Sequence, residues 1–165
     1  MDWFTSYLSN RKQYVCFLNE TSSTLDITCG VPQGSILGPL LFLIYVNDLY
    51  TVCPNSFCLH FADDTSIFVR DKDLESLLRN IDVSLGSVIL WFQANKLSVN
   101  LDKTNYMVFC MRNKKNINFD NIQITIQGCN IERVSKVKFL GVWLDEQLNW
   151  KSHIAYVSSK VSKVI

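Results

Sequence analysis

The chain has 165 residues, of which 48% are hydrophobic and 19% charged, with a formal net charge of +1 at pH 7. This length suits one compact domain with a real core and gives no sign of a second one. The near-zero net charge excludes a positive electrostatic potential over the whole molecule. Any contact with nucleic acid must therefore come from a few lysine or arginine side chains at particular positions.

The cysteines and the hydropathy of the chain bear on whether it is a disulfide-bonded, zinc-binding or membrane protein. The six cysteines form no CxxC pair and no cysteine–histidine cluster at zinc spacing, so free thiols in a reducing compartment are the simplest account. The longest apolar run, residues 36–46, is interrupted by Gly38 and Pro39. It is far shorter than the roughly 20 residues of a membrane span. With no secretory leader either, we expect an intracellular protein of the nucleus or cytoplasm that does not bind membranes.

The first part of the chain is predicted as a hairpin, a loop and a helix. Residues 13–18 and 25–28 are β-prone and flank a polar stretch, which indicates a hairpin. Residues 30–35 form a loop by their glycine and proline content, and Pro39 then suits the first turn of a helix over residues 39–49. This helix is apolar on every side, which predicts that it is buried.

An acidic pair, Asp63 and Asp64, lies between two β-prone runs at residues 57–61 and 65–69. A two-residue acidic turn between such runs indicates a hairpin with both carboxylates at its tip.

The next element is an amphipathic helix, which Asp71 or Asp73 can cap. Its apolar stripe consists of Leu74, Leu77, Leu78, Ile81, Leu85, Val88, Ile89 and Phe92. Strand-like runs follow at residues 105–110, 122–126 and 136–144, and a further helix is expected at residues 150–164. Helices and antiparallel hairpins together predict an α+β fold in which helices pack on an antiparallel sheet.

The acidic pair is the part of the sequence that indicates a metal-binding site. Two adjacent carboxylates repel each other unless a cation lies between them. Their oxygens suit Mg²⁺, which binds through one or two carboxylates and substrate phosphates. For an isolated pair, an ordinary turn with both groups in water is the simpler account.

Other motifs in the chain favour a metal site at the acidic pair over an ordinary turn. In order along the chain come residues 30–42 (GVPQGSILGPLLF), residues 47–49 (NDL), residues 61–64 (FADD) and residues 138–142 (KFLGV), the last followed by Leu148, Trp150 and His153. This series resembles the palm of reverse transcriptases from non-LTR retrotransposons. The loop at residues 30–35 is called the glycine loop below. Residues 3–13 also resemble the segment that precedes this loop in those elements, so the resemblance covers nearly the whole chain.

The resemblance implies a metal site and a primer contact. Asp63 would bind catalytic Mg²⁺ and Asp64 would assist, as part of a two-ion site for nucleotidyl transfer. Ala62, next to Phe61, would face the primer end.

The resemblance also implies a nucleotide site. Pro32, Gln33 and Gly34 would contact the incoming nucleotide and the template, with Gln33 as the polar reader. Lys103 would stand near the leaving pyrophosphate and donate a proton; the alternative is a solvated cation. The family often has proline where this chain has Leu101. The partners implied are an RNA template, a DNA primer and deoxynucleoside triphosphates, whereas the sequence indicates no protein partner.

The resemblance further implies a partial polymerase domain over residues 1–165. The palm would span about residues 13–145, the fingers would be incomplete, and a thumb or connection would begin near residue 150. The family's further metal-bridging aspartate has no counterpart here, because the acids before the glycine loop are Asp2, Glu20 and Asp26 and none lies in a matching strand. We therefore expect weak Mg²⁺ binding and no activity from the chain alone.

Two alternative hypotheses remain open at this stage. One is a catalytically dead remnant that acts at most as a nucleic-acid-binding module, and the other is an unrelated α+β regulatory domain. Several aromatic side chains could be base-stacking platforms, but on helical or strand-like runs a place in the core is the simpler interpretation. They are Trp91, Phe92, Trp143 and Trp150. His60 is interpreted as a histidine with satisfied ring nitrogens rather than a metal ligand.

Overall fold

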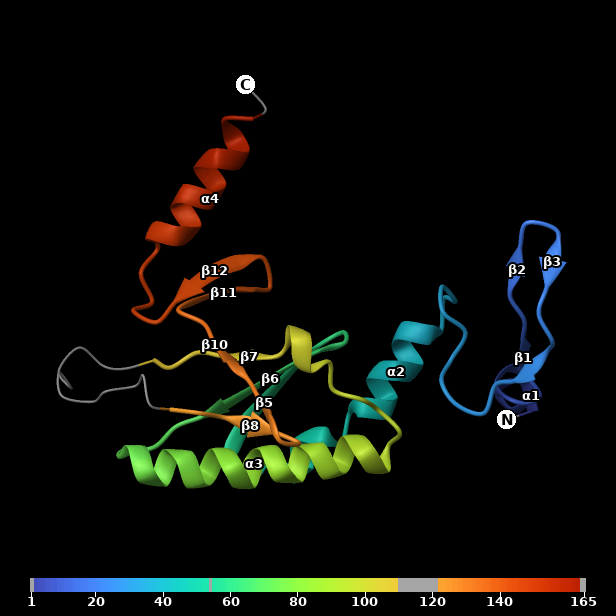
Figure 1. Ribbon diagram of the computed structural model, residues 1–165, viewed down its shortest axis with the longest axis horizontal. Coiled ribbons are helices and arrows are strands. Elements are labelled where there is room, and N and C mark those ends of the chain that lie inside the picture. Colours follow the sequence, from blue (N-terminus) through green and yellow to red (C-terminus); the bar gives the residue numbers. More distant parts are fainter. Residues whose placement is uncertain (1, 54, 110–121, 164–165) are drawn as a thin grey trace. The chain divides into compact units, whose positions relative to one another are not determined.

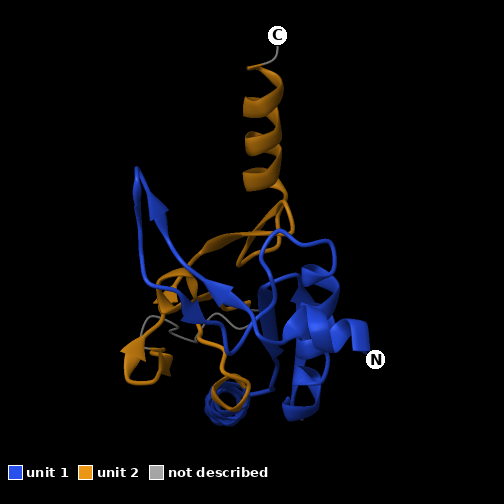
Figure 2. Ribbon diagram, turned by 90° about the vertical axis from the view of Figure 1, so that its right-hand side faces the viewer, with its two compact units in different colours: residues 1–91 blue, residues 92–165 orange. Residues whose placement is uncertain are grey.

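The computed structural model describes residues 2–53, 55–109 and 122–163 of the chain. It divides into two compact units, Met1–Trp91 and Phe92–Ile165, coloured blue and orange in Figure 2. The end of the expected strand at residues 105–110 lies outside the described residues. The extent of a single partial domain, and of a palm and thumb within it, stays a prediction. No helix in the described part of the chain is long and apolar enough to cross a membrane.

Unit 1 opens with a short helix and a two-part hairpin. These elements are α1 (Asp2–Leu8), β1 (Lys12–Gln13), β2 (Cys16–Phe17), β3 (Glu20–Thr21) and β4 (Leu25–Asp26). Strand β1 pairs with β4 and β2 with β3, both antiparallel, so a hairpin is present as predicted. Its turn is shorter than expected, because β3 lies within the polar stretch that was predicted as the loop. Between the two parts the Ser22 hydroxyl accepts a hydrogen bond of 2.9 Å from the Val15 amide. This side-chain contact continues the pairing where the strand ladder is broken.

Helix α2 (Gly38–Val46) occupies most of the stretch 39–49 that was predicted as one helix, and the 3-10 helix η1 (Leu49–Val52) follows it. The predicted burial of this helix is wrong. Within α2 only Gly38 and Val46 are buried, and several apolar side chains are about half exposed or more. These are Leu40, Leu43, Ile44 and Tyr45. An all-apolar helix is buried only where other elements surround it, and the described residues cover α2 on part of its surface.

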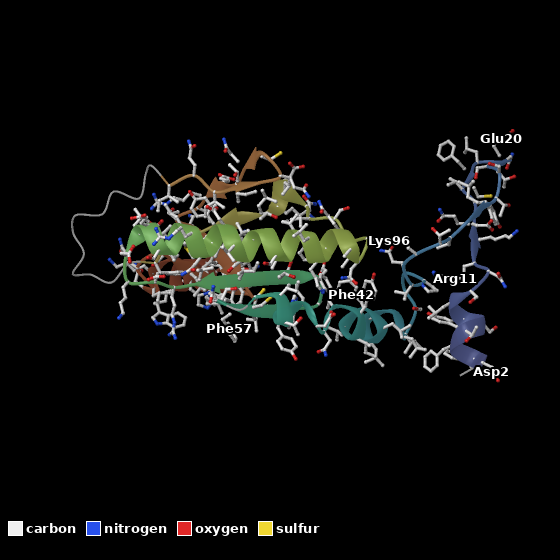
Figure 3. The ribbon with its side chains drawn as sticks, turned by 90° about the horizontal axis from the view of Figure 1, so that it is seen from below. Asp2, Arg11, Glu20, Phe42, Phe57 and Lys96 are labelled. Carbon is white, nitrogen blue, oxygen red and sulfur yellow. The ribbon has the colours of Figure 1, made fainter. Side chains whose placement is uncertain are left out.

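Strands β5 (Ser56–Phe61) and β6 (Asp64–Val69) form the longest hairpin of the described chain, with antiparallel pairing from Ser56↔Val69 to Phe61↔Asp64. Helix α3 (Leu74–Ala94) lies beside this hairpin (Figures 1 and 3). The carboxylate of Asp73 accepts a hydrogen bond of 2.8 Å from the Ser76 amide, so Asp73 is the predicted cap. That hydrogen bond is the main reason why the pKa of Asp73 lies below its usual value.

The predicted apolar stripe of α3 is confirmed by burial. All eight of its residues are buried or half-buried, whereas Val83 and Leu90, outside the stripe, are 54% and 67% exposed. Val88 is 2% exposed and Trp91 8% exposed. Trp91 is therefore a core residue, as expected.

Unit 2 is built from short elements. The elements are η2 (Leu101–Lys103), β7 (Asn105–Tyr106), β8 (Thr125–Ile126), β9 (Cys129–Asn130), β10 (Glu132–Arg133), β11 (Lys136–Phe139), β12 (Val142–Asp145) and α4 (Lys151–Val161). Strands β8–β9 and β11–β12 pair antiparallel, and β7–β10 pair parallel. The buried hydrophobic side chains among the described residues of this unit are Ile122, Ile124, Ile126 and Ile131.

The run at residues 136–144, expected as one strand, is two strands. Phe139 pairs with Val142, so Leu140 and Gly141 form a two-residue turn, and their φ angles are +46° and +87°. Positive φ at both central residues is the pattern of a type I′ turn. Because the apolar character continues through Leu140, hydropathy alone does not show the turn.

The coarse fold class is confirmed as mixed helices and β structure, but the expected single antiparallel sheet is not found in the described residues. Each described strand pairs with one neighbour, which gives six two-stranded sheets. Most of these strands are two residues long. Such strands offer few backbone groups to a third strand.

Burial on α3 yields a direct stability test. Replacing Val88 by alanine should lower the free energy of unfolding by about 1–3 kcal/mol, because it removes buried methyl groups and leaves a cavity. Leu90→Ala, on the exposed side of the same helix, should change it by less than about 0.5 kcal/mol. Urea unfolding followed by circular dichroism measures both. Equal costs for the two variants would contradict the assigned face.

Candidate active site

The acidic pair lies at the tip of the β5–β6 hairpin, but the turn is shifted by one residue from the predicted position. Phe61 pairs with Asp64, so the turn consists of Ala62 and Asp63, and Asp64 is the first residue of β6. Phe61, Ala62, Asp63 and Asp64 are all exposed. The four motif residues are therefore brought together at one accessible place.

The backbone at the tip is strained at Ala62, whose φ is +53°. Two-residue hairpin turns need a positive φ at their first central residue, so that the turn matches the twist of the strands. A residue with a Cβ adopts this conformation at a cost of about 1–2 kcal/mol. Asp63 is the other central residue of this turn.

The carboxylates of the tip are available to a ligand. Neither Asp63 nor Asp64 forms a side-chain hydrogen bond or an ion pair with any described residue. Within residues 2–53, 55–109 and 122–163 no three His, Cys, Asp or Glu side chains are grouped so that they could hold a metal ion by themselves. Two carboxylates fit the way proteins bind Mg²⁺, which keeps several waters and also takes substrate phosphates.

A second set of side chains supports the hairpin near its tip. His60 pairs with Thr65 across the strands, and the Thr65 hydroxyl lies 3.1 Å from its Nδ1. The Cys58 thiol lies 3.3 Å from Nε2, so both ring nitrogens have partners, in agreement with the interpretation from sequence. Burial lowers the pKa of His60. Burial, with the neighbouring Cys53 thiol, raises the pKa of Cys58 to about 11.

The glycine loop is a tight turn that presents its central residues to solvent. The Ser35 amide donates to the Pro32 carbonyl over 3.3 Å, and Gly34 has a φ of +78°. A positive φ at the third turn position is typical of a type II turn, which favours glycine there. Gln33 and Gly34 are exposed. The side chain predicted to read the template or nucleotide therefore stands at an accessible turn.

Ser35 and Gly38, which sequence reasoning did not single out, connect this turn to α2. The Ser35 hydroxyl donates to the Pro32 carbonyl over 2.7 Å and accepts from the Gly38 amide over 3.0 Å. A Cβ on Gly38 would lie 3.0 Å from the Ser35 oxygen and 3.3 Å from the Pro32 oxygen, which is too close without a shift. The N-cap position itself is Leu37, which has no side-chain hydrogen bond, so Ser35 supplies the acceptor for the first amide of the helix.

Arg11 is a further support that no sequence pattern indicated. Its guanidinium donates to the carbonyls of Leu8 (3.1 Å), Cys29 (3.5 Å) and Gly30. Figure 3 labels Arg11 at the junction of α1 and the strands that follow it. The side chain thus ties the end of α1 to the start of the glycine loop.

Lys103 belongs to unit 2 and is exposed at the end of η2. Leu101 is the first residue of this 3-10 turn. Proline is also accepted at the first position of a helical turn, so leucine there is compatible with the shape that the family's proline would give. A place for Lys103 beside the acidic pair stays a prediction.

Comparison with known proteins supports the resemblance. The family model described as reverse transcriptase (RNA-dependent DNA polymerase) matches residues 1–144. A probable RNA-directed DNA polymerase from transposon BS of Drosophila melanogaster is 28% identical over 158 residues, which is 90% of this chain and 17% of that protein. The RNA-directed DNA polymerase from mobile element jockey of the same species is 26% identical over 92% of this chain and 17% of its own length.

A third relative is a retrovirus-related Pol polyprotein from a type-1 retrotransposable element of Bradysia coprophila. It is 28% identical over 94% of this chain and 15% of its own length. The chain therefore spans about a sixth of the length of these relatives. No solved structure matches the chain.

The strain at the hairpin tip can be tested by substitution. Ala62→Gly should raise the free energy of unfolding by about 0.5–1 kcal/mol, because glycine adopts a positive φ without a steric penalty. Ala155→Gly, within helix α4, is the matched control and should lower it by about 1 kcal/mol. Chemical unfolding measures both. A loss of stability in both variants would show that Ala62 is not strained.

The environment of His60 predicts a dependence of stability on pH. Because the pKa of His60 in the folded chain lies below the ordinary 6.5, the unfolded chain binds a proton more readily. The stability from this group is present above about pH 6.5 and is lost as the pH falls through the folded pKa. The free energy of unfolding should drop less between pH 7.5 and 5.0 in His60→Asn than in the original chain. Identical pH profiles would contradict this environment.

Proposed function

Because the chain belongs to the reverse transcriptase (RNA-dependent DNA polymerase) family, we propose that it forms part of the catalytic palm of a retrotransposon polymerase that copies RNA into DNA. The observation that carries the proposal is the β5–β6 tip, which presents two carboxylates to solvent with no side-chain partner in the described structure. Two neighbouring acids without a partner, one on the strained turn and one at the start of β6, repel each other, and a bound cation offsets that repulsion.

In this proposal Asp63 and Asp64 hold Mg²⁺. When two such ions are bound, they activate the primer hydroxyl and neutralise the charge that develops on the phosphate oxygens. Asp63 stands at the apex of the turn and Asp64 on the first pair of the ladder, so the two carboxylates can bind ions from a fixed backbone. Phe61 and Ala62 flank them on the primer side.

The glycine loop supplies the proposed nucleotide contacts. Gln33 and Gly34 lie exposed at the turn, and a residue without a side chain lets a ligand approach the backbone. Arg11 and Ser35 hold the two ends of this turn by hydrogen bonds to backbone atoms. The loop is therefore positioned before a nucleotide arrives, which lowers the entropy cost of binding.

Lys103 is proposed to protonate the leaving pyrophosphate, and its exposed ammonium on a short helical turn supports that role. The partners of the complete polymerase would be an RNA template, a DNA primer and deoxynucleoside triphosphates inside the cell. The comparisons do not favour the alternative of a noncatalytic remnant, because the relatives are named as polymerases.

The proposed metal site can be tested on the chain itself with Mn²⁺ as a paramagnetic probe. Amide signals of residues 61–65 should broaden first as Mn²⁺ is added, and Asp63→Asn should weaken that broadening because it removes one carboxylate ligand. Asp82→Asn, an exposed acid on α3, is the control and should leave the effect at the tip unchanged. Equal broadening in Asp63→Asn and the original chain would rule out the site.

Activity is tested in a parent-length polymerase that contains this segment. There Asp63→Asn should abolish primer extension on an RNA template while the unfolding midpoint is retained. Lys103→Ala should slow extension by a factor of about 10²–10⁴, the usual contribution of general acid catalysis. Undiminished extension by the Asp63 variant would contradict the catalytic assignment.

A further inference from the structure

Unit 1 has a hollow between helix α2, the 3-10 helix η1 and strand β5. Its volume is about 510 Å³. Binding sites for small molecules usually enclose about 300–1,000 Å³ and are mostly apolar with a few polar groups. Among the lining residues are Leu43 of α2, Tyr50 of η1, and Ser56, Phe57, Cys58 and His60 of β5. None of the residues that line the hollow belongs to the acidic tip or to the glycine loop.

Three large side chains give the hollow an accessible apolar wall. Leu43 is 46% exposed, Tyr50 63% and Phe57 64%. Phe57, which Figure 3 labels, has its ring centre 6.1 Å from that of Phe68, its partner across the strands. Apolar surface leaves water favourably, and aromatic rings pack well on other flat rings. This wall therefore favours an aromatic ligand.

The polar side chains of the hollow are uncharged near pH 7. Burial lowers the pKa of His60, so its ring is neutral there. Burial and the neighbouring Cys53 thiol raise the pKa of Cys58 to about 11, so this thiol keeps its proton. Among the residues that the structure describes, no Asp, Glu, Lys or Arg lines the hollow. A charged ligand would lose hydration here without gaining a counter-ion, so the hollow favours an uncharged molecule.

One hydrogen-bonding group of the hollow is unused. The hydroxyl oxygen of Ser56 is buried and has no hydrogen-bond partner within the described part of the chain. The His60 ring differs, because Cys58 and Thr65 engage both of its nitrogens. Ser56 as a whole is only half-buried, so rotation about its Cα–Cβ bond can present the hydroxyl to a ligand. A ligand that bonds to this hydroxyl removes the cost of leaving it without a partner.

We propose that this hollow binds a small, uncharged aromatic molecule that carries a hydrogen-bonding group. The ring of the ligand packs against Tyr50 and Phe57, and its polar group bonds to the Ser56 hydroxyl. Binding requires no metal ion, nucleotide or nucleic acid. The site therefore stands or falls independently of the polymerase chemistry.

The test is a titration of the full chain with 2-naphthol at pH 7, followed through the amide signals in NMR spectra. The signals of residues 43–47, 50 and 56–60 should shift and saturate. The anion 2-naphthoate has the same rings and should bind at least about tenfold more weakly, because it would have to leave its hydration shell in an uncharged hollow.

The role of Ser56 is isolated with 2-methylnaphthalene, in which a methyl group replaces the hydroxyl. The ratio of the affinities for 2-naphthol and 2-methylnaphthalene should fall by about 2–10-fold in Ser56→Ala, which corresponds to the loss of one hydrogen bond. Ser56→Ala also removes a buried hydroxyl without a partner. Its midpoint of urea unfolding should therefore not fall, so the change in binding does not come from a loss of fold.

The apolar wall is tested with a matched pair of variants. Phe57→Ala should weaken the binding of both neutral ligands by roughly tenfold, because it removes the exposed ring. Leu90→Ala, which truncates a similarly exposed apolar side chain on α3, is the control and should leave both affinities unchanged.

Several outcomes would overturn the proposal. Equal affinities for 2-naphthoate and 2-naphthol would contradict the choice of an uncharged ligand, and an unchanged affinity ratio in Ser56→Ala would contradict the hydrogen bond. Equal losses in Leu90→Ala and Phe57→Ala would show an unspecific apolar effect. Shifts of the lining signals with the concentration of the chain alone would show that a second copy fills the hollow. Absence of binding in a parent-length polymerase would show that another segment covers it.

Discussion

The constraint on which the candidate site depends is the repulsion between two neighbouring carboxylates at a tight turn. Asp63 and Asp64 have no side-chain partner among the described residues, so the backbone must hold them in place. The six-pair ladder of β5 and β6 does this, with a strained φ at Ala62 at its end. The hairpin therefore holds two exposed acids next to each other without a compensating side chain among the described residues.

In the glycine loop, the residues that are exposed to a ligand differ from the residues that hold the backbone in place. Gln33 and Gly34 face solvent, while Arg11 and Ser35 bind backbone atoms on either side of the turn. The residues that would touch a nucleotide are therefore distinct from those that hold the loop. A change at a supporting residue would move the loop without removing any ligand contact, which is how a distant substitution can affect binding.

Charge is distributed locally rather than globally. The net charge of +1 leaves the molecule without an overall field, yet unit 1 carries an unpaired acidic tip and unit 2 carries lysines gathered on aromatic rings.

The sequence by itself determined the features that depend on local pattern. The hairpin around the acidic pair, the capped amphipathic helix with its stripe and the turn at Gly34 all follow from spacing and backbone preference within a few residues, and the ordered motifs indicated the family. Only the tertiary structure decided the one-residue shift of the turn to Ala62 and Asp63, because strand alternation does not fix where pairing ends. It also decided the exposure of α2, the exposure of Trp150, which was expected in the core, and the contacts of Arg11. Burial and long side-chain contacts depend on residues distant in the chain, which no local pattern contains.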